Sequence, residues 1–237
     1  MNVYVAEILG TALLITLGNG VVANVILHKT KGNNGGLIAI TLGWAMAVFV
    51  GVLASANSSG AHLNPAVTIG LAVCGKFDWT LVPGYMLAQL IGSMIGALLV
   101  WIIYRQHFDE TTDAATKLAV FSTAPSIRNA QHNFVAEFLA TFIFMLTILF
   151  ITKSSNSLGS LDALPVALVV LGVGLGLGGP TGYAINPVRD LGPRIMHSIL
   201  PIKHKGSSDW QYSWVPVFGP LAGAIAAAVL YQLIVTS

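Results

Sequence analysis

The dipeptide Asn-Pro occurs twice in matched surroundings and supplies residue types that could handle polar solutes. The two copies are Asn64-Pro65-Ala66 and Asn186-Pro187-Val188. Asn is a favoured helix N-cap and Pro a favoured first helical residue, because the N–H that Pro lacks has no partner in a first turn. Each copy therefore predicts the start of a helix. An Asn amide donates hydrogen bonds, and a helix N-terminus carries about half an elementary positive charge. Two such ends facing each other would hold a water molecule by its oxygen and repel cations and protons.

Arg189 follows the second copy and lies at the end of a long apolar stretch. A charged side chain within a membrane-spanning region is costly and suggests function by default. We expect Arg189 to line a pore, with snorkelling to the lipid headgroups or pairing with Asp190 as the alternatives. We assign Asp190 to structural support, because the helix dipole favours an acid in the first turn and Arg194 at i+4 is a ready partner.

Glu7 and Glu137 occupy equivalent places near the starts of two apolar stretches. Buried carboxylates need hydrogen-bond donors, and loops that enter a membrane carry backbone N–H groups that no helix satisfies. We expect each carboxylate to support such a loop, with a proton relay as the alternative. His62 and the other histidines lack metal-ligand spacing, so His62 is also expected to be structural. No nucleophile–base pair is evident, so the sequence predicts no catalytic residue, no metal, no cofactor and no enzyme activity.

These residues belong to a very apolar chain of 237 residues, of which 55% are hydrophobic and 8% charged. A soluble domain carries about 25% charged residues. Six runs with at most one charge reach the length of about 20 residues that a transmembrane helix needs. They are 3–27, 37–61, 80–104, 133–152, 163–188 and 212–237. The sequence predicts a multi-pass integral protein of a cell membrane, embedded in the lipid bilayer. The net charge of +2 gives no reason to expect a nucleic-acid partner.

The two halves of the chain repeat three landmarks in the same order: the Glu segment, the Asn-Pro segment, and a Val-Pro pair followed by Gly-x-x-x-Gly. Each half holds three spans, and an odd number inverts the second half relative to the first. We place repeat 1 at about 1–115 and repeat 2 at about 130–237, within a single transmembrane channel domain, 1–237.

Each Asn-Pro segment lies between the second and third span of its half. The stretch 64–73 corresponds to about 15 Å of helix, half of a hydrocarbon core that is about 30 Å thick. The predicted fold is an all-α membrane protein with six transmembrane helices plus two re-entrant half-helices. Non-helical backbone at the midplane is tolerated where it is packed in protein or lines a wet cavity. A water-filled path is therefore expected where the half-helices meet.

Taken together, these features resemble the major intrinsic protein family, the aquaporins and glycerol facilitators. The resemblance rests on both Asn-Pro boxes, both glutamates and the duplication, and it covers nearly the whole chain. It implies a right-handed six-helix bundle, a pore in each subunit and a homotetramer. In this family a constriction near the outer mouth forms the selectivity filter, and its positions map onto Trp44, Gly174, Tyr183 and Arg189.

The resemblance also indicates a subclass. Asp190 directly after Arg189 is similar to glycerol facilitators, and Gly174 stands where strict water channels typically carry His, which would leave a wider opening. Two departures are Val188, where the family usually has Ala, and Tyr183, often Phe in glycerol facilitators. The expected function is passive diffusion of glycerol and other small uncharged solutes, with water, while ions and protons are excluded.

Two other functions remain open from the sequence. One is a channel mainly for water or another neutral solute, such as urea, hydrogen peroxide or protonated lactic acid. The other is a proton-coupled transporter of small acids that titrates Glu7, Glu137 or a histidine. Uptake that depends on a proton gradient would distinguish the transporter from the channel.

The distribution of basic residues conflicts with the family's orientation, in which both chain ends are cytoplasmic. Cytoplasmic loops normally carry the excess of Lys and Arg. Here the inner side holds only Lys76 and Lys153, and the outer side holds Lys29, Lys31, Arg105, Lys117, Arg128, Arg189, Arg194, Lys203 and Lys205. We keep the family orientation as the expectation.

Overall fold

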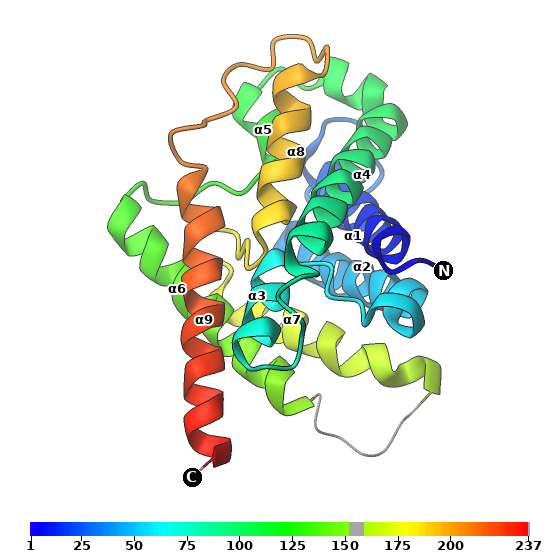
Figure 1. The fold of residues 1–237 in the computed structure, drawn as a ribbon. Coiled ribbons are helices and arrows are strands. Elements are labelled where there is room, and N and C mark those ends of the chain that lie inside the picture. The colour runs from blue at the N-terminus through cyan, green and yellow to red at the C-terminus, as the bar shows by residue number, and fades with distance from the viewer. Residues whose placement is uncertain (152–158, 237) are drawn as a thin grey trace.

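The computed structural model describes residues 1–151 and 159–236, and every regular element in those ranges is a helix (Figure 1). Five helices are long and apolar enough to cross a membrane. They are α1 (Val3–Ile26), α2 (Gly36–Ser59), α4 (Val82–Glu110), α6 (Ala130–Ile151) and α9 (Trp214–Thr236). Their lengths suit a hydrocarbon core about 30 Å thick.

The sixth predicted span is shorter than expected within the described residues. The 3₁₀ helix η1 (Gly159–Ala163) leads into α7 (Leu164–Leu177), which has 14 residues. A helix not expected from the sequence, α5 (Ala114–Phe121), lies between the two halves. Its N-cap Asp113 accepts a hydrogen bond from the Thr116 backbone N–H, which explains why a helix starts in this polar segment.

Both Asn-Pro boxes start short helices. Helix α3 (Pro65–Val73) has nine residues and α8 (Pro187–Ile199) has 13. Each Asn takes an extended conformation, and its side-chain oxygen accepts from the backbone N–H two residues on, as an N-cap does. Figure 1 shows α8 and α3 in the middle of the bundle, surrounded by the longer helices.

The elements of the two halves pack in an equivalent pattern. Helix α1 packs against α2 and α4, as α6 packs against α7 and α9. Each half-helix also crosses to the other half, because α3 packs against α9 and α8 against α4. Helices α2 and α7 contact each other across the junction of the halves. The result is one interlocked bundle.

Glycines allow the closest helix crossings at equivalent places. A Cβ on Gly92 of α4 would lie 2.4 Å from the carbonyl oxygen of Ile8 in α1. A Cβ on Gly223 of α9 would lie 2.3 Å from the carbonyl oxygen of Phe138 in α6. Only glycine lets the helix backbones approach to this distance. The packing role that the Gly-x-x-x-Gly spacing predicts is confirmed.

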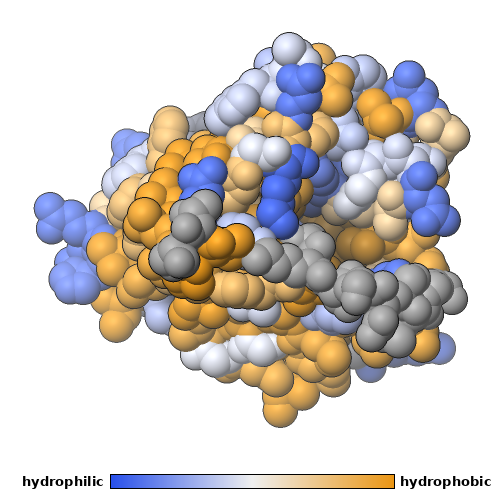
Figure 2. All heavy atoms as spheres, turned by 60° about the horizontal axis from the view of Figure 1, so that its bottom comes forward, coloured by the Kyte–Doolittle hydropathy of each residue, from blue (hydrophilic) through white to orange (hydrophobic). Residues whose placement is uncertain are grey.

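The surface and the interior have the polarity expected of a protein in lipid. Large apolar side chains such as Ile38, Ile103 and Leu233 are more than 60% exposed. Fully buried side chains include the charged groups of Glu7 and Arg194. Figure 2 shows apolar side chains mainly over the left and lower parts of the visible face, with hydrophilic ones above and between them. Charged groups buried beneath such a surface need partners inside the protein.

Candidate functional site: the cavity between the half-helices

The loops that precede α3 and α8 share an unusual backbone conformation. Three residues in each loop have positive φ, at equivalent positions: Gly60, Ala61 and Leu63, and Gly182, Tyr183 and Ile185. The φ of Ile185, a β-branched residue, is 44°. Such conformations cost about 1–3 kcal/mol each and persist only where the surroundings impose them. Both loops are therefore held in shape by other groups.

Glu7 of α1 holds the first loop. One carboxylate oxygen accepts from the His62 backbone N–H at 3.0 Å, and the other accepts from the Leu63 N–H at 2.7 Å. The Ser59 hydroxyl and the Gln89 side-chain amide donate to the same carboxylate, at 2.6 and 2.8 Å. The Glu7 side chain is fully buried, so each of these donors compensates part of the cost of burying its charge.

Glu137 of α6 makes the equivalent contacts in the second half. Its two oxygens accept from the backbone N–H groups of Ala184 and Ile185, at 2.9 and 3.0 Å. The carboxylate is also fully buried. Both glutamates thus accept from loop N–H groups, as their places in the sequence predict.

The two Asn side chains join the loops across the centre of the protein. The Asn64 amide donates to the carbonyl of Ile185 at 2.9 Å, and the Asn186 amide donates to the carbonyl of Leu63 at 2.9 Å. Each Asn oxygen is occupied by its own helix, through the backbone N–H of Ala66 or Val188. An amide nitrogen has two N–H groups, so each Asn keeps a second donor.

A cavity of about 150 Å³ lies at this junction, lined by both Asn residues. Its wall is otherwise mostly apolar, with Val52, Leu71 and Phe144 among the lining residues. The cavity therefore combines a few N–H donors with a hydrocarbon wall. A solute with hydroxyl groups on one edge and C–H groups on the other fits such a surface.

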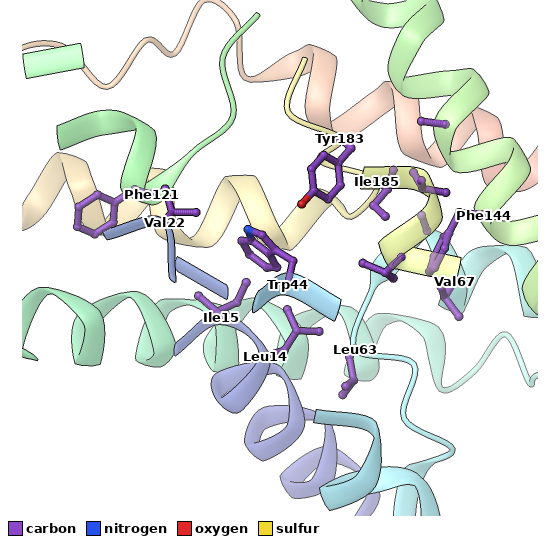
Figure 3. Packing of buried hydrophobic residues seen from close by; sticks show 14 of the residues in the cluster. Leu14, Ile15, Val22, Trp44, Leu63, Val67, Phe121, Phe144, Tyr183 and Ile185 are labelled. Carbon is purple, nitrogen blue, oxygen red and sulfur yellow. The ribbon is translucent and has the colours of Figure 1, made fainter. Parts of the chain in front are cut away.

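Trp44, Tyr183 and Arg189 also line this cavity. The Arg189 guanidinium lies over the Trp44 ring, 4.3 Å from its centroid, and one N–H donates to the Phe121 carbonyl at 3.4 Å. Figure 3 shows Tyr183 and Trp44 near each other, with the Tyr183 hydroxyl towards Trp44. Three of the four predicted filter residues are thus brought together.

Gly174, the fourth, is not among the lining residues of the described chain. Its missing side chain was expected to widen the opening. Instead, Thr41 and the Tyr183 ring occupy this space: a Cβ on Gly174 would lie 2.4 Å from Thr41 Cγ2 and 2.9 Å from Tyr183 Cζ. The widening effect of the glycine is offset by the two side chains that pack on it.

The remaining box residues, Pro65, Ala66, Pro187 and Val188, are buried, and none is among the lining residues in the part of the chain that the structure describes. Val188, the departure from the family's usual Ala, therefore does not form part of the cavity wall.

His62 lines the cavity and is also part of a polar network. Its Nδ1 lies 3.1 Å from the Thr68 hydroxyl, to which the Gln89 amide donates at 2.9 Å. The His62 ring packs between Phe77 and Tyr85, with centroids 4.5 and 4.9 Å away. Sequence reasoning missed Gln89 and Thr68. An uncharged polar residue inside the apolar run 80–104 was the available signal for Gln89.

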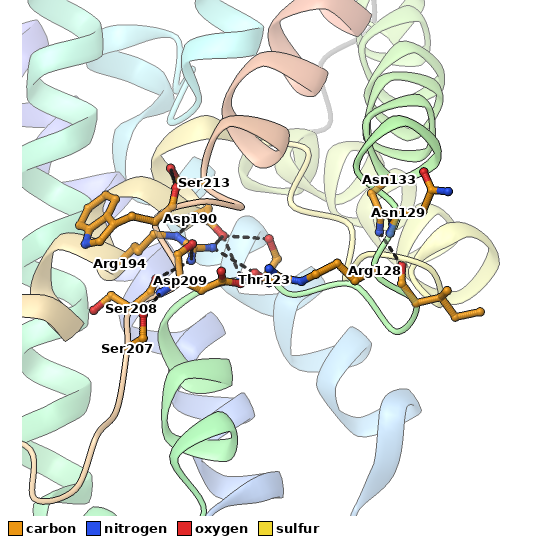
Figure 4. A network of polar contacts seen from close by, with 12 residues as sticks. Thr123, Arg128, Asn129, Asn133, Asp190, Arg194, Ser207, Ser208, Asp209 and Ser213 are labelled. Carbon is orange, nitrogen blue, oxygen red and sulfur yellow. Dashed lines mark hydrogen bonds and ion pairs between the residues drawn. The ribbon is translucent and has the colours of Figure 1, made fainter.

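A second buried network surrounds Asp190 and Arg194 of α8 (Figure 4). Asp190 pairs with Arg194 at 2.7 Å, and both side chains are fully buried. Asp190 also accepts from the backbone N–H and the hydroxyl of Thr123, both at 2.8 Å. Arg194 donates to the carbonyls of Ser208 and Asp209, at 2.7 and 2.9 Å. The pair thereby fastens the segments after α5 and after α8 to the second half-helix.

Fold and site together describe a multi-pass membrane protein in which two half-helices meet at an internal cavity. The family model of the major intrinsic proteins matches residues 1–231. A protein of Thermotoga maritima named probable glycerol uptake facilitator protein is 52% identical over 98% of this chain and 99% of its own. A glycerol uptake facilitator protein of Streptococcus pneumoniae is 50% identical over 98% of this chain and 99% of its own.

A solved structure agrees with these relatives. The X-ray structure of the aquaglyceroporin from Plasmodium falciparum superposes with a TM-score of 0.88 at 35% identity, over 98% of this chain and 96% of that chain. The chain belongs to the major intrinsic protein family. It is an integral membrane channel and not an enzyme. The family and the fold class predicted from the sequence are confirmed.

Proposed function

We propose that this channel carries glycerol and other small uncharged solutes, with water, passively across a cell membrane. The observation that supports this most is the cavity itself, in which N–H donors of Asn64, Asn186 and Arg189 face an otherwise apolar wall. Relatives about 50% identical over nearly their whole length are named glycerol uptake facilitators. Both point to a polyol as the main solute.

The Asn-Pro boxes form the midplane of the pore in this proposal. The N-termini of α3 and α8 both lie at the cavity, so the partial positive charges of the two helix dipoles add there. This field opposes cations and hydronium. The second N–H of each Asn orients the oxygen of a passing water or hydroxyl group, which interrupts a chain of hydrogen-bonded waters along which protons would move.

Trp44, Tyr183 and Arg189 form the selectivity filter. Arg189 donates to hydroxyl groups, and the two rings contact the carbon backbone of the solute. The buried guanidinium also repels cations. Gly174 takes part indirectly, by leaving room for the Tyr183 ring.

Glu7 and Glu137 are structural supports, as are His62 and Asp190. Both oxygens of each glutamate accept from backbone N–H groups. Protonation would remove an acceptor from a loop whose shape depends on it. This observation favours a passive channel over a proton-coupled transporter.

The oligomer is a homotetramer, with one pore in each subunit, and residues 1–237 form one domain of two inverted repeats. The apolar helix faces that contact lipid or a second copy include exposed residues such as Leu42 and Leu168. The mass of the detergent-solubilised protein, measured by light scattering with the detergent subtracted, tests the tetramer. A monomer as the only species would contradict it.

Reconstituted vesicles test the transport function directly. In a stopped-flow instrument, vesicles placed in hyperosmotic glycerol should shrink and then reswell, without dependence on a proton gradient. Water, urea and lactic acid, measured on the same preparation, separate the remaining neutral solutes. Shrinkage without reswelling would indicate a water channel, and reswelling abolished by an uncoupler would indicate the transporter.

A further inference from the structure

Tyr183 rests against the backbone of α7 at two glycines that lie one helical turn apart. A Cβ on Gly178 would lie 2.4 Å from the Gly174 carbonyl oxygen and 2.5 Å from Tyr183 Cδ1, and one on Gly174 would lie 2.4 Å from Thr41 Cγ2 and 2.9 Å from Tyr183 Cζ. Real Cβ atoms do not approach other heavy atoms below 3.0 Å. The ring therefore occupies volume that a side chain at either position would contest.

The backbone of Tyr183 cannot move away to relieve such a contact. Its φ is 40°, and the next two residues donate their backbone N–H groups to Glu137. The ring lies against α7 at these two glycines, and Tyr183 also lines the cavity together with Trp44 and Arg189. A side chain at 178 would therefore displace the ring into the cavity.

We propose that Gly178 determines the solute specificity of this channel, although it does not line the cavity. It is a positioning residue: it sets how far the Tyr183 ring withdraws towards α7, and hence the width left for a polyol beside Trp44 and Arg189. The inference rests on the proposed glycerol function. Gly178 lies at the C-cap of α7, outside both Asn-Pro boxes and outside the four predicted filter positions.

Gly178→Ala tests this proposal, with Gly176→Ala as the matched control. Gly176 lies on the same helix, and a Cβ there would meet no atom within 4 Å. In vesicles of equal protein content, Gly178→Ala should lower glycerol permeability about tenfold, a factor that one methylene group gives in a closely fitting site. Water permeability should fall less than about twofold, because water is much smaller. Gly176→Ala should match the wild type for both solutes.

A second background separates movement of the ring from damage to the helix, since a Cβ at 178 would also lie 2.4 Å from the Gly174 carbonyl oxygen. The Tyr183→Ala background has no ring to displace, so adding Gly178→Ala there should leave the ratio of glycerol to water permeability unchanged, whereas damage to the helix would lower both permeabilities in either background. If Gly178→Ala alone does not accumulate in the membrane, recovery of its yield by Tyr183→Ala supports the proposal.

Three results would overturn it: an unchanged glycerol-to-water ratio in Gly178→Ala, an equal loss of both fluxes, or a double variant as impaired as the single one. Glycerol permeability of wild-type vesicles is measured before any variant is compared. Wild-type vesicles impermeable to glycerol would refute the proposed function rather than the role of Gly178.

Discussion

Asn64 and Asn186 each hydrogen bond to the loop that carries the other. The amide of Asn64 donates to the residue before Asn186, and the amide of Asn186 donates to the residue before Asn64, both at 2.9 Å. Each half of the chain therefore fixes the position of the helix N-terminus that the other half contributes.

Asn186→Asp should weaken both the barrier to cations and the junction of the loops. A carboxylate cannot donate to the Leu63 carbonyl, and its charge cancels the positive field of the helix ends. Leaving that buried carbonyl without a donor costs about 1–3 kcal/mol. Sodium influx into vesicles, followed with an indicator dye, should rise above the wild-type level. Asn64→Asp, the equivalent change, should behave alike, and cation-tight vesicles from both variants would contradict the midplane assignment.

Glu7→Gln should lower the yield of folded protein. The amide presents a donor to a site filled by donors from His62, Leu63 and Gln89, so at least one buried N–H loses its acceptor. Loss of a hydrogen bond to a charged group costs about 1.5–3 kcal/mol. Thermal unfolding in detergent, read by size-exclusion chromatography, measures the shift. A variant of wild-type stability whose transport has lost pH dependence would support a proton relay instead.

Arg189→Val should broaden selectivity. The substitution removes the positive charge and the cation–π contact with Trp44, and it enlarges the cavity between that ring and Tyr183. Permeability to larger polyols and to charged solutes should rise, while glycerol flux is retained. Vesicle reswelling in a series from urea to pentitols gives the profile. A profile identical to that of the wild type would remove Arg189 from the filter.

Tyr183→Phe should shift the channel modestly towards glycerol over water, by about twofold or less. The ring keeps its place against Gly174, and only a polar atom leaves the wall of the cavity. The ratio of the two permeabilities, determined on one vesicle batch, is the relevant quantity. A large fall in glycerol flux would count against this view of the residue.

Asp190→Asn should strongly destabilise the attachment of the segments after α5 and α8 to helix α8. The change leaves the fully buried Arg194 without its ionic partner, and breaking a buried pair in this way costs about 3–5 kcal/mol. Arg194→Met combined with Asp190→Asn removes both charges and should recover part of the loss. Protease resistance of the segment 122–129 in sealed vesicles reports the effect. Equal stability of the single variant and the wild type would show that the pair does not hold these loops.

Much of the architecture could be predicted because its signals are local and repeated. The capping preference of Asn and Pro gave the two half-helices, and the glycine spacing indicated the close crossings of α4 with α1 and of α9 with α6. The duplication then related the halves. The domain boundaries and the roles of the site residues stay predictions that the experiments above address.

Other features could not be predicted because they depend on long-range contacts. The Tyr183 ring fills the space at Gly174 only because the loop before α8 is folded back against α7. The hydrogen bond from the Thr123 N–H to Asp190 joins segments far apart in sequence. The Gln89 amide in α4 donates to the Glu7 carboxylate in α1, and the pattern of apolar residues along either helix does not indicate this contact.

Several basic residues counted on the outer side have hydrogen-bond or ionic partners within the protein. Lys117 and Arg194, counted among the outer basic residues, are buried with hydrogen-bond partners, and Arg128 pairs with Asp209. Lys153, on the inner side, lies outside the described residues. The orientation in the membrane remains the expectation stated from the family resemblance.

The exchange of half-helices between the repeats has a consequence for biosynthesis. Helix α3 is made early by the ribosome, yet it packs against α9, the final helix of the chain. A nascent chain that ends before Trp214 leaves α3 without this partner. The native packing around the pore can therefore form only after α9 has been synthesised. Premature termination near the C-terminus should therefore yield a protein without transport activity, however much of the cavity lining it contains.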